Sequence, residues 1–219
     1  MALSFSYSFL SQDITCPEAA RHLYVLRDFK NTWTVSDGID AHKILEQRLK
    51  SKQPLPDALA HAEPMVQSLE KYAIEPLQVE VSYAVDRNLM PVGFWDRSVF
   101  LRGKYDVVVR YPQEHRACIA DWKTGRVRES SDQLELGALL LMANDPAVDE
   151  VSGCNLWLQS SKVGTPYKFK RLEKGPLWAK WLSKIQAIEK RDPQVEWEKR
   201  EGPLCAYCPV KTCNYYRGG

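Results

Sequence analysis

The sequence predicts a single α/β domain with a mixed central β-sheet flanked by helices. Three observations lead to this prediction. The 219 residues suffice for one domain with a substantial core and are too few for two full domains. The middle of the chain alternates apolar and polar residues with the period of a strand, and the segments around it repeat apolar residues with the period of a helix.

Three helices are expected ahead of the strands, over residues 16–28, 37–50 and 63–72. Prolines stand near the start of the first and third, where a helix tolerates them because its first N–H groups have no intrahelical partner. The second helix carries an apolar stripe, made of Ile39, Ile44, Leu45 and Leu49. Together these helices form an N-terminal helical region.

The period changes to that of a β-strand in the middle of the chain. Residues 77–86 alternate apolar and polar side chains, which indicates a half-buried strand. Two β-rich runs follow at residues 98–111 and 116–123, so we expect a meander of three strands. Beyond it we expect, in order, a helix, two strands and an amphipathic helix, over residues 130–144, 151–159, 167–171 and 176–190.

We predict that residues 1–219 form one domain with three parts. Residues 1–75 are the helical part, 76–191 the core and 192–219 a cysteine-rich C-terminal segment. No apolar run approaches the ~20 residues that a membrane-spanning helix needs, so no membrane partner is expected. The first ten residues lack the regions of a secretory signal, and we therefore expect a cytoplasmic protein with reduced thiols.

The net charge of +2 hides an uneven distribution along the chain. Residues 97–128 contain eight basic and three acidic side chains, and residues 162–191 contain nine basic and two acidic ones. Residues 129–161 between them contain six acidic side chains and no basic one. This layout fits a polyanion-binding surface with a carboxylate centre, and it fits solvated helix faces and loops equally well.

A constellation of carboxylates and a lysine lies in the predicted meander. Asp121 and Lys123 are two residues apart at the end of a strand, so their side chains share one face. Asp106 lies on the preceding strand, and because neighbouring strands are only ~4.8 Å apart, the two aspartates can share a divalent ion. Mg²⁺ or Mn²⁺ held by two carboxylates beside a lysine suits phosphodiester hydrolysis. The same residues also fit a surface Asp-Lys cross-strand pair and an aspartate in a turn.

Further motifs surround these residues in a fixed order. They are Gly-x-x-x-His at Gly38–His42, Gly-x-x-Asp at Gly103–Asp106, Asp-x-Lys-Thr-Gly at Asp121–Gly125 and a following helix with Gln133 near its start. This series resembles the RecB-like branch of the PD-(D/E)XK nuclease superfamily. The resemblance implies a restriction-endonuclease-like fold, with His42, Asp106 and Asp121 as metal ligands. It also implies that Lys123 is the catalytic lysine and that Gln133 lies near the scissile phosphate.

Several of these residues have other readings. Glu80, on the first strand, is a further candidate ligand or supporting acid. His42 also suits an ordinary amphipathic helix, and Gln133 suits a capping box opened by Ser130, which is compatible with a second role. The branch usually has tyrosine four residues after the glutamine, whereas this chain has Gly137.

The cysteines form a split cluster. Cys205, Cys208 and Cys213 supply three thiols within nine residues, and Cys16 supplies a fourth. Four thiolates suit a 4Fe-4S cluster or a structural zinc ion, and spacing alone does not separate them. One cysteine before the nuclease motifs and three after them resembles the iron-sulfur nucleases of the same branch, including the AddB nuclease domain and CRISPR-associated exonucleases. The resemblance implies a 4Fe-4S cluster on these four residues, and a last gap of four residues, where the family often has five, keeps zinc open.

The resemblance implies a Mg²⁺- or Mn²⁺-dependent deoxyribonuclease, and an exonuclease rather than an endonuclease. It would process single-stranded DNA or duplex ends in recombination, repair or CRISPR adaptation. No Gly-x-x-x-x-Gly-Lys-Ser/Thr motif occurs, so a helicase, recombination or CRISPR partner would supply unwinding. The alternative is a catalytically silent DNA-binding adaptor of the same fold. Gly137 favours the adaptor, and the intact Asp106, Asp121 and Lys123 favour the enzyme.

Overall fold

The computed structural model describes residues 3–29 and 36–218, and for residues 36–40 it describes the backbone alone. The chain forms two compact units, which are described separately. One is Ser36–Ala179, and the other combines Met1–Val35 with Lys180–Gly219. The prediction of one domain with three parts, divided at residues 75 and 191, remains a prediction. The compact units follow other bounds, because they group the second and third predicted helices with the strands.

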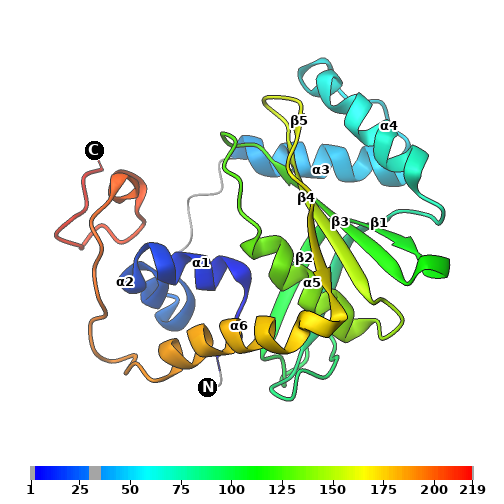
Figure 1. Ribbon diagram of the computed structural model, residues 1–219. Coiled ribbons are helices and arrows are strands. Elements are labelled where there is room, and N and C mark those ends of the chain that lie inside the picture. The colour runs from blue at the N-terminus through cyan, green and yellow to red at the C-terminus, as the bar shows by residue number, and fades with distance from the viewer. Residues whose placement is uncertain (1–2, 30–35, 219) are drawn as a thin grey trace. The chain divides into compact units, whose positions relative to one another are not determined.

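The unit Ser36–Ala179 is built on a six-stranded mixed sheet (Figure 1). Its strands are β1 (Gln78–Val85), β2 (Leu101–Tyr111), β3 (Arg116–Lys123), β4 (Glu150–Trp157), β5 (Lys162–Val163) and β6 (Tyr167–Lys170). The first three form the predicted antiparallel meander, and β4 pairs in parallel with β3. A parallel pair needs a crossover, which α5 (Asp132–Asn144) provides. Both β5 and β6 are antiparallel to β4, so the sheet is mixed as predicted.

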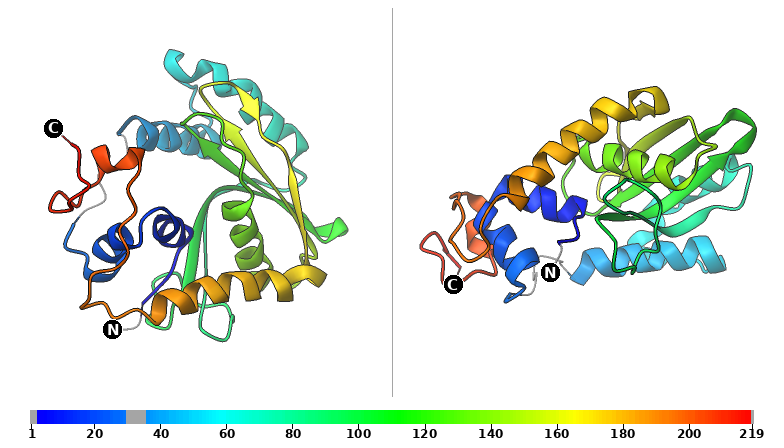
Figure 2. Two further views of the ribbon diagram at one scale, coloured as in Figure 1. Left: turned by 60° about the vertical axis from the view of Figure 1, so that its left-hand side comes forward. Right: turned by 90° about the horizontal axis from the view of Figure 1, so that it is seen from below.

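Helices cover both faces of this sheet, with α3 (Ser36–Ser51, blue) and α5 (light green) on opposite sides (Figure 2). Residues 134–142 of α5 are all buried, as expected of a helix inside a core. On the other face, α3 and α4 (Glu63–Tyr72) pack against alternate residues of the strands. The side chains of that second core include Leu45, Leu49, Val66, Val107, Val109, Ala120, Trp122 and Leu156.

The predicted elements of this unit are found within a few residues of their expected bounds. The largest difference is at β2, which begins at Leu101 rather than Ser98, because Asp96 and Ser98 form a turn in which Asp96 Oδ1 accepts from the Ser98 N–H at 2.8 Å. The two-residue strand β5 was not predicted, since two residues are too few to show a period. None of the described helices has the length and apolar content needed to span a membrane.

The other unit contains α1 (Tyr7–Thr15), α2 (Pro17–Ala20), a π-helical segment (Arg21–Leu26) and the C-terminal half of α6 (Lys174–Glu189). Helix α1 was not predicted, although Ser6 caps it by accepting from the Phe9 N–H at 3.3 Å. The single helix expected over residues 16–28 was wrong in detail. The structure divides it into α2 and the π-helical segment, and Arg27 ends it in a left-handed conformation with φ of 57°.

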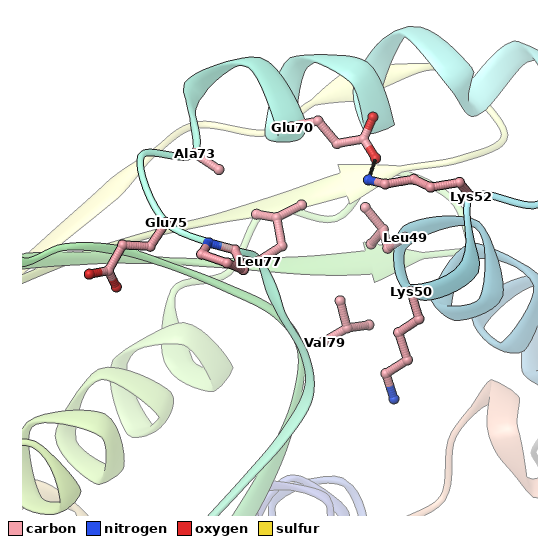
Figure 3. Close-up of a pocket in the computed structure, with 9 residues that line it drawn as sticks. Leu49, Lys50, Lys52, Glu70, Ala73, Glu75, Leu77 and Val79 are labelled. Atoms are coloured by element: carbon pink, nitrogen blue, oxygen red, sulfur yellow. Dashed lines mark hydrogen bonds and ion pairs between the residues drawn. The ribbon is translucent and has the colours of Figure 1, made fainter.

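Helices α3 and α4 are joined by a cationic hub at Arg48. Its guanidinium contacts Glu63, at 3.0 Å from Nε to Oε2, and Glu70, at 3.0 Å from Nη1 to Oε1. Lys52 also pairs with Glu70, beside a pocket of about 550 Å³ with an apolar floor that includes Leu49 (Figure 3). None of the predicted catalytic or metal-binding residues lines this pocket.

These ion pairs make the packing of α3 on α4 sensitive to acid. Arg48 lowers the pKa of Glu63, and Lys52 and Arg48 together lower that of Glu70. A lowered pKa in the folded state stabilises the protein above the ordinary glutamate pKa of about 4.3, and this stabilisation is lost as the pH falls through the lowered value. We expect Arg48→Met to reduce the free energy of unfolding by about 1 to 2 kcal/mol at pH 7 and to flatten its decline between roughly pH 5 and pH 2.

Urea titrations across that pH range would test this prediction. Lys50→Met is the matched control, because Lys50 forms an exposed pair with Glu46 one helical turn away, at 2.6 Å. Such pairs contribute about 0.3 to 0.5 kcal/mol. Equal acid profiles for the Arg48→Met and Lys50→Met variants would contradict the role given to the hub.

Candidate active site

Asp106 and Asp121 lie where strands β2 and β3 separate. The antiparallel ladder between the two strands ends at the pair Val107 and Ala120. Asp106 and Asp121 are the next opposed residues in the same register, and they are not paired. The two carboxylates predicted to lie on adjacent strands are therefore the first residues beyond the end of the ladder.

An irregularity in β1 and β2 directs Asp106 toward helix α3. Tyr105 packs toward α5, where its ring lies against Gly137, whereas Val107 belongs to the core under α3. Residues two apart on a regular strand share a face, so β2 changes face at Asp106. Glu80 is opposite Asp106 in the register of β1 and has a positive φ of 60°, which is uncommon for a residue with a side chain. The distorted backbone lets Asp106 and Val107 both point to the α3 side.

His42 and Asp106 contact each other directly. His42 Nδ1 lies 3.2 Å from Asp106 Oδ1, and the N–H of Trp122 donates to Asp106 Oδ2 at 2.8 Å. The hydrogen bond to Asp106 raises the pKa of His42 above its ordinary value, although burial opposes the shift. Asp106 therefore has one oxygen toward helix α3 and the other fixed by the backbone of β3. Gly38, the first residue of the predicted Gly-x-x-x-His motif, lies within residues 36–40, for which the backbone alone is described.

Asp121, Lys123 and Gln133 form a closed ring of polar contacts. Lys123 Nζ lies 2.6 Å from Asp121 Oδ2 and donates to Gln133 Oε1 at 2.6 Å. Gln133 Nε2 completes the ring by donating to Asp121 Oδ1 at 2.7 Å. Asp121 is only 5% exposed, and this burial raises the pKa of its carboxyl despite the nearby Lys123. A buried carboxylate with a fixed ammonium beside it is typical of a functional site.

Glu80, opposite Asp106 in the register of β1 and β2, is engaged by another residue. It forms an ion pair with Lys104, which is two residues before Asp106 on β2. Among the residues that the structure describes, no group of three or more His, Cys, Asp or Glu side chains is arranged to hold a metal ion. The chemistry of the donors nevertheless fits Mg²⁺ or Mn²⁺, because both ions prefer carboxylate oxygens, and Asp106 and Asp121 supply these from adjacent strands.

Comparison with known proteins identifies the family. A sequence model of the PD-(D/E)XK nuclease superfamily matches residues 4–213. The chain belongs to the PD-(D/E)XK nuclease superfamily. Among solved structures it is similar to one titled "Crystal structure of SSO0001", with 14% identity and a TM-score of 0.44 over 99% of this chain and 89% of that chain. No curated protein matches the sequence.

Membership in this superfamily makes the protein a metal-dependent nuclease domain that acts on DNA. Its predicted α/β fold with a mixed central sheet is confirmed. The residues singled out in the sequence come from four elements of this fold. His42 comes from α3, Asp106 and Asp121 from the adjacent strands β2 and β3, and Gln133 from the first turn of α5.

The predicted capping role of Gln133 is wrong. Helix α5 begins at Asp132 with Ser131 as its N-cap, and within the described chain the Ser131 side chain makes no capping hydrogen bond. The Ser130 hydroxyl accepts from the Asp132 N–H at 3.4 Å instead, and the Gln133 amide is engaged by Asp121 and Lys123. The contacts of the superfamily motif prevail over the local helix cap at this position.

Tyr105 explains why this superfamily member has glycine where the RecB-like branch usually has tyrosine. A Cβ atom at Gly137 would lie 2.6 Å from Tyr105 Cε1 and 3.1 Å from Ile119 Cδ1. Tyr105 is 4% exposed, so it cannot easily move away. The ring of Tyr105 therefore occupies the space that any side chain at position 137 would need.

Asn155 is a residue of this region that the sequence did not single out. It is directly opposite Asp121 in the parallel ladder between β3 and β4, and it is 4% exposed. Its Nδ2 donates to the Ser130 carbonyl at 3.4 Å, and its Oδ1 has no hydrogen-bond partner among the residues that the structure describes. Buried polar atoms are rarely unpaired, so this amide is a candidate for contacts made only when a ligand is present. A single asparagine in an apolar strand carries no sequence signal comparable to the motifs that identified the other site residues.

The four predicted cluster cysteines lie in one compact unit as free, partly buried thiols. Burial raises the pKa of the Cys208 thiol, and the nearby thiols of Cys16, Cys213 and Cys205 raise it further. Cys16 is far from the other three in sequence, yet it belongs to the same compact unit as they do. All four are free thiols of the type that a 4Fe-4S cluster or zinc binds, but within the part of the chain that the structure describes no three of them are arranged as a metal site.

The contact between Gly137 and Tyr105 predicts the effect of a small substitution. We expect Gly137→Ala to lower the free energy of unfolding by about 1 to 3 kcal/mol, because the added methyl overpacks the core. Adding Tyr105→Leu should reduce that loss, so the two changes should be non-additive in a double-mutant cycle. Denaturant unfolding of the single and double variants would measure both effects.

Gly175→Ala is the control for this experiment. Gly175 lies in α6 with no atom within 4 Å of an added Cβ, so alanine there should leave stability unchanged or raise it by up to about 1 kcal/mol. If Gly137→Ala behaved like Gly175→Ala, the packing explanation for the missing tyrosine would be wrong.

Proposed function

We propose that this PD-(D/E)XK protein is a Mg²⁺- or Mn²⁺-dependent DNA exonuclease. The observation on which the proposal rests is the end of the β2–β3 ladder, where Asp106 and Asp121 stand side by side and the ammonium of Lys123 is held by Asp121 and Gln133. These residues place two oxygen donors and a fixed cation together at one end of two strands.

Asp106 and Asp121 would hold the divalent ion, with His42 as a further ligand or as the partner that orients Asp106. When bound, such an ion supplies a Lewis acid for the phosphoryl group and lowers the pKa of a coordinated water. Glu80 would act as a supporting acid opposite Asp106, because its present partner is Lys104.

Lys123 and Gln133 have roles that follow from their own contacts. The Lys123 side chain is 28% exposed, so its ammonium is accessible yet fixed by two partners. A cation fixed before the reaction stabilises negative charge developing on phosphoryl oxygens without the cost of reorganisation. Gln133 holds that ammonium and Asp121 in one arrangement, and it is therefore a positioning residue as well as a neighbour of the expected phosphate.

The exonuclease assignment rests on the resemblance to the RecB-like branch, whose members process DNA ends. We propose single-stranded DNA or duplex ends as substrate, and recombination, repair or CRISPR adaptation in the cytoplasm as the setting. The chain contains no P-loop motif, so a helicase, recombination or CRISPR protein would open the duplex.

We further propose a 4Fe-4S cluster on Cys16, Cys205, Cys208 and Cys213, with zinc as the alternative. The free state of these thiols and their place in one compact unit support either choice. The cluster would join the two ends of the chain within their compact unit. Buried Glu18 already links these ends, because it accepts from the N–H of Trp197 at 2.7 Å and from Arg21 Nε at 2.8 Å.

Digestion of end-labelled linear DNA tests the nuclease. With Mn²⁺ or Mg²⁺, we expect the wild-type protein to release label from the end of single- or double-stranded substrates. Asp121→Ala and Lys123→Ala should each lower the rate by at least about 100-fold, since each removes a group that stabilises transition-state charge. Both variants should retain DNA binding, and the position of the released label would give the polarity.

Lys162→Ala is the matched control for Lys123→Ala, because Lys162 is an exposed lysine that forms only a long ion pair with Glu129, at 3.9 Å. Its cleavage rate should match that of the wild type. A wild-type protein that binds DNA but cuts nothing with either metal would instead favour the silent adaptor, and a circular substrate cut as fast as a linear one would favour an endonuclease.

Anaerobic purification tests the cluster. We expect a brown protein with absorbance near 400 nm and about four iron atoms per chain, and Cys208→Ser should lose the colour and much of the iron. Cys154→Ser is the control, because Cys154 packs in the core under α3 and α4 and should leave the colour intact. A colourless protein with one zinc ion per chain would establish the alternative.

A further inference from the structure

The connection between β1 and β2, residues 86–100, presents an exposed tryptophan. Trp95 is 82% exposed, although large aromatic side chains are usually covered. Its ring lies edge-on to Phe94, with centroids 5.0 Å apart. The guanidinium of Arg102 lies over both rings, 5.0 Å from the centroid of Phe94 and 4.9 Å from that of Trp95. The exposed aromatic ring is therefore held from one side by a cation.

A tight turn fixes the backbone around this ring. The N–H of Asp96 donates to the Gly93 carbonyl at 2.9 Å, and Asp96 Oδ1 accepts from both the N–H and the hydroxyl of Ser98. Arg102 Nη1 also donates to the Phe94 carbonyl at 3.3 Å. Trp95 is thus presented on an ordered turn, and its exposure does not come from a loose loop.

The charges around the ring favour an anionic ligand. Residues 86–104 contain four basic and two acidic side chains. Both acids are engaged in turns, because Asp86 Oδ1 accepts from two backbone N–H groups and Asp96 binds Ser98. Arg97 is exposed beside Trp95, and the guanidinium of Arg87 lies 4.8 Å from the ring centroid of Phe100. The aromatic turn is accordingly rimmed by guanidinium groups.

Strand β2 connects this turn to the candidate active site. Arg102, Lys104 and Asp106 alternate along β2, so their side chains lie on one face. Four residues of strand span about 13 Å, a distance that a few nucleotides cover. Lys104 pairs with Glu80 and keeps 57% of its side chain exposed, so a basic path leads from the tryptophan toward Asp106.

We propose that Trp95 is a stacking platform for an unpaired base of the DNA substrate, a few nucleotides from the phosphate at Asp106, and that Arg102 holds the ring and contacts the backbone. The inference rests on the proposed function, because it assumes that DNA reaches Asp106. A single-stranded ligand fits better than a protein surface, because the exposed ring can stack on a base while its guanidinium neighbours contact the adjoining phosphates.

Equilibrium binding of a fluorescent single-stranded oligonucleotide in EDTA tests the platform without cleavage. Trp95→Ala should weaken binding about 5- to 100-fold, the loss expected from one stacked base, and Trp95→Phe should stay within about threefold of the wild type. A 2-aminopurine base placed at successive positions should be quenched at one or two of them by the wild type and not by Trp95→Ala. Arg102→Ala should weaken binding, and it should be non-additive with Trp95→Ala.

Tyr72→Ala is the matched control, because Tyr72 is a 63% exposed aromatic with Lys71 5.8 Å from its ring, at the end of α4. It should bind DNA as the wild type does. Trp95→Ala binding as tightly as Tyr72→Ala would overturn the proposal, and so would self-association of the wild type that Trp95→Ala abolishes with DNA binding unchanged. A wild type that binds through Trp95 but cleaves nothing would refute the nuclease and leave the platform standing.

Discussion

The end of the β2–β3 ladder is the constraint on which the rest of the site depends. As long as the strands pair, their backbones satisfy each other and their side chains point into one core or the other. Where pairing stops, the N–H of Trp122 turns to Asp106, and Asp121 is left buried at the end of an apolar strand. A buried carboxylate is unfavourable unless charged and hydrogen-bonding groups accompany it. Lys123 and Gln133 are these groups, so the burial of the Asp121 carboxylate determines where both of them lie.

Side chains from both helical layers reach the end of this ladder. Helix α3 packs on one face of the sheet and α5 on the other, and a continuous sheet would keep their side chains apart. Beyond the end of the ladder, His42 from α3 contacts Asp106 while Gln133 from α5 contacts Asp121. The distorted backbone at Glu80 contributes by letting β2 change face at Asp106. Such strain persists where the surrounding structure imposes it, which is common at functional sites.

The packing of Tyr105 against Gly137 accounts for the clearest departure from the RecB-like pattern, which is the missing tyrosine at position 137. Tyr105 fills the space beside α5, and Gly137 accommodates it. The tyrosine that the branch carries on the helix would collide with the tyrosine that this chain carries on the strand. Packing thus explains the glycine without any loss of the groups that surround Asp121, and the departure is weak evidence for a silent protein.

The sequence by itself determined the class of fold, because the periods of its apolar residues reflect whether a segment has one buried face or two. It also predicted which side chains would carry the chemistry, because Asp106, Asp121, Lys123 and Gln133 follow a spacing that their strands and helix impose. Tertiary structure alone decided how these groups meet. The closed contacts of Gln133, the unpaired amide of Asn155 and the steric need for Gly137 all involve residues on different elements. Local periodicity reports burial along one segment, whereas these features depend on where separate segments end and pack.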